Sequence, residues 1–228
     1  QALLILQESL EEFQEFQHDV GISVCYYEIG HVMSSKKQYE EALVNFRKAL
    51  EIRREVYGEN HAETCSCYEA IGNTMSNKGR YDDAYIGYGK ALAIRINLFG
   101  KHHLHTASSY YNIGVVLNKK CKYDEAIPFF LKAKAIYTRE LGAEHPKTVD
   151  VNGYINTIGF RYSNKWDSLM LSGTGTLEEA IASLKTAQSI ISSCESGEGL
   201  SKVGSWQLIN SFLCTYRKAQ TTHPITNN

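Results

Sequence analysis

Apolar residues recur along this chain at the three- and four-residue spacing of an α-helix, not in the alternation of a β-strand. One such pattern covers residues 64–78 and stops at Gly79, a residue type common at helix ends. A second begins at Asp82 and ends near Gly100, with acidic residues in the first turn, where the helix dipole favours them. The pattern predicts two helices joined by a short turn.

This helix pair recurs at a strict interval of 42 residues. A Tyr-acid-acid-Ala marker opens the second helix of each pair, at Tyr39, Tyr81 and Tyr123. A Gly-x-x-His-x-x-Thr marker closes each pair, from Gly58, Gly100 and Gly142. A period of this length predicts a solenoid, because one pair cannot bury its apolar face alone and needs its stacked neighbours.

The markers divide the chain into a series of repeats, and the register loosens in the fourth, where we expect an insertion at 163–176 between its two helices. A strict 42-residue register would instead place Asn156 at the buried small position of that repeat. Because the chain begins at Gln1 and not at Met, we expect it to be a segment of a longer protein. The predicted regions are 1–17 (second helix of a truncated repeat), 22–60, 64–102 and 106–144 (repeats 1 to 3), 148–195 (repeat 4), 203–220 (a capping helix) and 221–228 (a tail).

These residues resemble the tetratricopeptide repeat, or TPR, whose pattern places an aromatic residue, Leu and Gly in the first helix and Ala, an aromatic residue and Ala in the second. The 42-residue unit and its two markers are similar to the kinesin light chain-like subfamily, over about residues 22–187. The resemblance implies an all-α, right-handed α-solenoid of stacked helix-turn-helix repeats, with a C-terminal capping helix. In kinesin light chains the concave groove of this fold recognises short acidic, tryptophan-containing segments.

Composition argues against several classes of protein but does not identify a binding partner. Basic and acidic residues nearly balance, at 24 against 25, so no long-range field attracts nucleic acid or an anionic membrane. No apolar run approaches the roughly 18 to 20 residues that span a bilayer. Six cysteines at irregular spacings do not form a disulfide framework, and we interpret them as reduced thiols of a cytoplasmic protein.

Candidate catalytic and metal-binding patterns are weak. His61, His103 and His145 recur one repeat apart, which favours turn residues bonded to local backbone over ligands of one ion. The helical Cys65-x-Cys67 pair points in diverging directions, which favours core thiols over a zinc site. No P-loop or nucleophile elbow is present. We therefore expect no enzyme activity, metal or cofactor.

The concave groove is the remaining candidate site. If the recurring Gly30, Gly72, Gly114 and Gly159 mark the buried position, residues at fixed offsets from each should face the groove. Asn can bond the backbone of an extended peptide, and Tyr or Phe can supply an apolar floor, although ordinary solvated positions are an equally weighted alternative. The predicted groove residues are Tyr27, His31, Glu69, Asn73, Asn77, Tyr111, Val115, Asn118, Lys119, Asn156 and Phe160, with Ser34 and Asn164 at matching offsets.

A row of lysines, Lys36, Lys78, Lys120 and Lys165, falls six residues after each marker glycine. It is either a basic rail for an acidic peptide or, as we favour, a set of cations at helix C-termini. The predicted function is a protein-protein interaction scaffold that binds a peptide segment of a partner, with no nucleic acid or membrane. The alternatives are an architectural array that self-associates end to end, or a regulatory domain of a larger protein.

Overall fold

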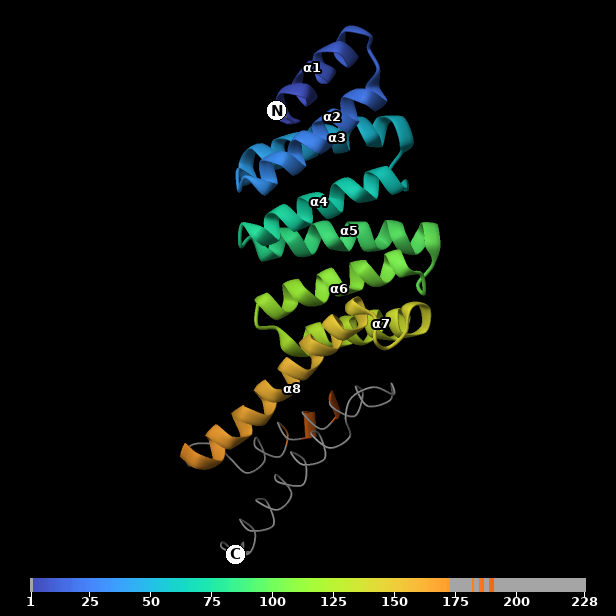
Figure 1. Cartoon of the computed structure of the whole chain (residues 1–228). Coiled ribbons are helices and arrows are strands. Elements are labelled where there is room, and N and C mark those ends of the chain that lie inside the picture. Colours follow the sequence, from blue (N-terminus) through green and yellow to red (C-terminus); the bar gives the residue numbers. More distant parts are fainter. Residues whose placement is uncertain (1, 173–181, 183–184, 187–188, 191–228) are drawn as a thin grey trace, which may run out of the picture. The chain divides into compact units, whose positions relative to one another are not determined.

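The computed structural model describes residues 2–172, 182, 185–186 and 189–190, and every element in them is a helix. The predicted capping helix, the tail and most of the second helix of repeat 4 lie outside the described residues. The helices are α1 (Ala2–Glu15), α2 (Asp19–Ser35), α3 (Tyr39–Tyr57), α4 (Ala62–Asn77), α5 (Tyr81–Phe99), α6 (Leu104–Lys119), α7 (Tyr123–Leu141) and α8 (Pro146–Ser172) (Figure 1).

The predicted fold class, an all-α helical solenoid, is confirmed for the described residues. The chain divides into two compact units within α7, one ending at Ile136 and one starting at Tyr137. In the first unit each helix from α1 to α6 packs against the next, and α2 also contacts α4 (Figure 1). The helices α2, α4 and α6, each the first of its pair, therefore follow one another along the stack. The site described below lies between them. No helix among the described residues is long and apolar enough to cross a membrane.

In each helix pair, an aromatic ring from the second helix packs directly against a glycine of the first helix. A Cβ atom added to Gly30 would lie 2.7 Å from the ring of Phe46, and one added to Gly72 would lie 2.9 Å from the ring of Tyr88. Gly114 has the same relation to Phe130, at 2.8 Å. The first helix can approach the second this closely only because the glycine has no side chain. The small-residue and aromatic positions expected from the repeat pattern thus form the seam of each pair.

The Gly-x-x-His-x-x-Thr marker is a helix-capping turn. His61, His103 and His145 each accept the backbone N–H two residues later at Nδ1, with N–Nδ1 distances of 3.2 Å. The marker threonines, Thr64, Thr106 and Thr148, are fully buried and donate to the carbonyl oxygens of the marker glycines at 2.7 to 2.8 Å. These bonds satisfy groups left unpaired at helix ends. The expectation that the histidines bond local backbone is confirmed.

In the second unit, α8 is longer than the repeat pattern predicts. It continues without a break through 163–172, most of the segment expected to be an insertion between helices. Residues 173–176 of that segment lie outside the described residues. Val151, Ile155 and Ile158, at helical spacing, are fully buried.

Candidate functional site

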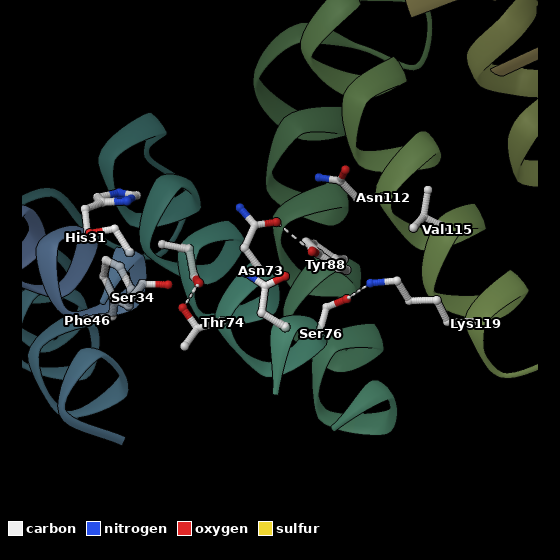
Figure 2. Close-up of a pocket in the computed structure, with 13 residues that line it drawn as sticks. His31, Ser34, Phe46, Asn73, Thr74, Ser76, Tyr88, Asn112, Val115 and Lys119 are labelled. Carbon is white, nitrogen blue, oxygen red and sulfur yellow. Dashed lines mark hydrogen bonds between the residues drawn. The ribbon is translucent and has the colours of Figure 1, made fainter. Parts of the chain in front are cut away.

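The described part of the first unit contains a cavity of about 500 Å³ between the helices α2, α4 and α6 (Figure 2). Phe46 from α3 and Tyr88 from α5 reach it from the second helices. Its lining residues are His31, Ser34, Ser35, Phe46, Ala70, Asn73, Thr74, Ser76, Asn77, Tyr88, Asn112, Val115 and Lys119. The volume lies within the range of about 300 to 1,000 Å³ typical of ligand pockets.

The structure brings together five of the groove residues predicted from sequence, namely His31, Asn73, Asn77, Val115 and Lys119. Tyr27, Glu69, Tyr111 and Asn118 lie on the same three helices but do not line the cavity. Asn156 and Phe160 belong to the second unit, where Phe160 is half exposed. Ser34, at a predicted offset in repeat 1, also lines the cavity.

Sequence reasoning missed the residues that enter the cavity from other positions. Phe46 and Tyr88 belong to second helices, and their rings reach the cavity across Gly30 and Gly72, which have no side chains in the way. The available signal was that each glycine is followed by an aromatic residue 16 positions later, and that this pair recurs every 42 residues. Asn112 was also missed, because it lies two residues before Gly114, an offset not assigned to the groove.

Two polar side chains of the cavity are held by neighbours. The Tyr88 hydroxyl donates to Asn73 Oδ1 at 2.6 Å, which leaves the Asn73 amide nitrogen available as a donor (Figure 2). Burial raises the pKa of Tyr88, so the hydroxyl stays protonated at neutral pH. Lys119 Nζ donates to Ser76 Oγ at 3.2 Å and lies 5.7 Å from the centre of the Tyr81 ring.

Beside the cavity, Glu69 is neutralised by an arginine. Arg95 from α5 donates through Nη1 and Nη2 to the two carboxylate oxygens of Glu69, and it also donates to Ser109 Oγ at 2.8 Å. Asn112 Nδ2 donates to the same carboxylate at 3.1 Å. A carboxylate only accepts, so this bond fixes the Asn112 amide with its oxygen as the remaining acceptor.

Repeat 1 holds a buried arginine at the equivalent position in a different way. Arg53 is 3% exposed and lies 4.4 Å from the centre of the Tyr27 ring. It also forms an ion pair with Glu63 at 3.0 Å. Tyr27 thus packs against Arg53, and it also contacts the rings of His31 and Phe46, which do line the cavity.

Three of the four lysines in the row lie at helix ends and do not line the cavity. Lys165 lies inside α8, because that helix continues to Ser172, so the helix-end interpretation does not hold for it. Lys36, Lys78 and Lys120 are the C-cap residues of α2, α4 and α6. Lys78 forms an ion pair with Glu40, and Lys120 forms one with Asp82, each reaching the first turn of the preceding second helix. This geometry agrees with the cation-at-helix-end interpretation and adds a link between successive pairs.

The chemistry of the described residues gives no support to a metal centre. No group of three His, Cys, Asp or Glu side chains within them is placed to hold an ion. Cys25, Cys65 and Cys67 are buried free thiols, and burial raises the pKa of Cys67 to about 11. A thiol with a raised pKa is a weak nucleophile and a weak ligand at neutral pH.

Comparison with solved structures shows similar folds at low sequence identity. BtubC (BKLC) from P. vanneervenii superposes with a TM-score of 0.61 at 20% identity, covering 86% of this chain and 74% of that chain. The TPR-like repeats of a kinesin light chain-like protein from Podosopora anserina give 0.59 at 14% identity, covering 83% and 85%. The apo form of RapI gives 0.54 at 17% identity, covering 86% and 77%.

Family comparison gives a more direct assignment. No match was found among curated proteins. The tetratricopeptide repeat family model matches residues 22–85, 71–139 and 106–153, which together span more than half of the chain. Together these matches include the 42-residue helix pairs and their glycine–aromatic seams. The chain therefore belongs to the tetratricopeptide repeat family.

Proposed function

We propose that this chain binds a peptide segment of a partner protein in the cavity between α2, α4 and α6. The tetratricopeptide repeat fold is in general a protein-interaction scaffold, typically without enzyme activity. The location of the peptide site is what this proposal adds to the general role of the fold. The single observation that carries it is a cavity of about 500 Å³ whose polar lining groups retain unused hydrogen-bonding capacity.

That capacity is distributed along the cavity. Asn73 offers an amide donor, because its oxygen is taken by Tyr88. Asn112 offers an acceptor, because its nitrogen is taken by Glu69. Asn77 is exposed and makes no side-chain hydrogen bond within the described residues. Alternating donors and acceptors match the N–H and C=O groups of an extended peptide backbone.

Charge favours a peptide that carries an acidic residue. Lys119 is the one Lys or Arg among the lining residues, and no carboxylate is among them. Glu69, which the sequence alone would place in the groove as a negative charge, is held by Arg95 beside it. An acidic side chain near Lys119 would form a charge-assisted hydrogen bond.

The test uses peptides selected from a random displayed library against this chain, with affinity measured by calorimetry. Asn77→Ala and Lys119→Ala are the test variants, because both side chains line the cavity and are exposed. We expect each to weaken binding about tenfold, the effect of losing one charged or well-placed hydrogen bond. Their helical content should be unchanged.

Lys101→Ala is the matched control, because Lys101 is exposed in the turn before α6 and does not line the cavity. It should bind the selected peptides with the affinity of the unmodified chain. Equal affinity for all three variants and the unmodified chain would place the binding surface elsewhere and refute the proposal.

A further inference from the structure

The outer face of the first unit carries a pattern that peptide binding in the cavity does not use. Helices α3, α5 and the first part of α7 are the second helices of successive pairs, and their equivalent positions are 42 residues apart (Figure 1). On each of them an acidic residue, an apolar residue and a lysine follow at four-residue intervals. All nine are exposed: Glu40, Val44 and Lys48; Asp82, Ile86 and Lys90; Asp124, Pro128 and Lys132.

Residues four apart lie on the same side of a helix, so each trio forms one stripe along its helix. Across the three helices the trios form three bands: an acidic band, an apolar band and a lysine band. In the apolar band Val44 is 50% and Ile86 is 58% exposed. Exposed apolar residues are common singly, but a row at the same position of three successive helices is a surface feature.

The charged bands on either side are held in position. Lys48 lies 4.8 Å from the centre of the Tyr26 ring, and Lys90 lies 4.9 Å from that of Tyr68. Lys132 lies 5.5 Å from the centre of the Tyr110 ring. On the other side, Glu40 and Asp82 are paired with the lysines at the ends of the next first helices, as described above. Charges that are already ordered lose less entropy when a partner binds.

We propose that this outer face is a contact surface for a second copy of the chain. The band order acid, apolar, lysine is self-complementary under a two-fold axis parallel to the bands. That rotation places the acidic band of one copy over the lysine band of the other, and it places the two apolar bands against each other. A two-fold interface requires a self-complementary patch of this kind.

The contact centres on α5, the middle helix of the three. Ile86 is more exposed than Val44, and Tyr85 beside it is 40% exposed. Under the two-fold axis Ile86 meets Ile86 of the second copy, while Asp82 faces Lys90. This side-to-side association differs from end-to-end stacking, which would bury helix faces at the chain termini.

Sedimentation of the full chain, from dilute to millimolar concentration, tests the proposal. We expect a reversible shift from 25.7 kDa to twice that mass. Ile86→Asp should weaken association by about tenfold or more, because it brings two carboxylates together at the two-fold axis. Val24→Asp is the matched control, since Val24 is 44% exposed but lies on α2, away from the bands. It should associate like the unmodified chain.

Charge reversal separates this interface from any other. One variant replaces Lys48, Lys90 and Lys132 by Glu, and a second replaces Glu40, Asp82 and Asp124 by Lys. Each alone should be monomeric, because like charges would face each other, while an equimolar mixture should form a heterodimer. A chain that stays monomeric at millimolar concentration, an Ile86→Asp variant that dimerises with unchanged affinity, or a mixture that stays monomeric would each overturn the proposal.

Discussion

Arg95 binds the carboxylate of Glu69 through two hydrogen bonds, one from each terminal nitrogen of its guanidinium group. The arginine side chain is 11% exposed and the glutamate side chain 24% exposed, so the pair is largely shielded from water. Asn112 from α6 joins the same carboxylate at 3.1 Å. The pair thus links three helices, and it fixes the orientation of an amide in the candidate cavity.

Removing the arginine should destabilise the first unit. In Arg95→Met the Glu69 carboxylate keeps only its bond from Asn112, and we expect a loss of about 2 kcal/mol in the free energy of unfolding by urea. Arg80→Met, which breaks the exposed pair with Asp83, is the control and should cost less than about 1 kcal/mol. Equal losses in the two variants would show that the shielded pair stabilises the fold no more than the exposed pair does.

Replacing a glycine by alanine should change the stability of the chain in opposite directions, depending on whether the glycine contacts an aromatic ring. Gly30→Ala should destabilise the chain by about 1 to 3 kcal/mol, because its Cβ would overlap the buried ring of Phe46. Gly89→Ala should stabilise it by about 0.5 to 1 kcal/mol, because Gly89 lies inside α5 with no atom within 4 Å of an added Cβ. Thermal unfolding of both variants measures the difference. A stabilising Gly30→Ala would contradict the proposed reason for the glycine.

The capping turns should depend on the marker threonine. Thr106→Val keeps the shape of a fully buried side chain but removes the hydroxyl that donates to Gly100 O. We expect a cost of about 1 to 2 kcal/mol in the free energy of unfolding. Thr157→Val is the control, because the exposed Thr157 hydroxyl bonds the carbonyl oxygen of Gly153 within α8. That control should change stability by less than about 0.5 kcal/mol.

Alkaline pH should weaken the fold through buried tyrosines. Burial, followed by a hydrogen bond to Glu59, raises the pKa of Tyr68 to about 12 from its ordinary value of about 10. A raised folded-state pKa gives stability that is present below about pH 10 and is lost as pH rises toward 12. Ultraviolet titration should show Tyr68 ionising late, and Tyr68→Phe should reduce the loss of stability in this pH range. An unchanged alkaline profile in the variant would refute the assignment.

The repeat architecture was predictable from sequence because its determinants are local and periodic. The Tyr-acid-acid-Ala marker, the capping histidines and the seam glycines each recur at 42 residues, and the histidines and glycines act through contacts that are close in sequence. The end of α8 was not predictable from the same register. The segment 163–172 contains no Gly or Pro to end a helix, so the helix continues where the repeat pattern placed an insertion.

The candidate site was predictable only in part, because neighbouring repeats determine which side chains are available. Glu69 and Tyr27 occupy equivalent groove positions by sequence. Their equivalent arginines, Arg95 and Arg53, contact them through an ion pair and a ring contact, and neither Glu69 nor Tyr27 lines the cavity. Asn112 lines the cavity at an offset the pattern did not assign. Such pairings join residues 26 or more positions apart, and they depend on how the helices pack, which the repeat pattern alone does not specify.

The central claim is that a peptide binds between α2, α4 and α6. The most direct measurement is a side-chain and backbone amide NMR spectrum of the chain, recorded with and without a library-selected peptide. The account predicts shifts concentrated at the cavity residues Asn73, Asn77 and Lys119, with little change at Ile86 and Lys90 on the outer face. Shifts concentrated on the outer face, with the cavity residues unchanged, would contradict it.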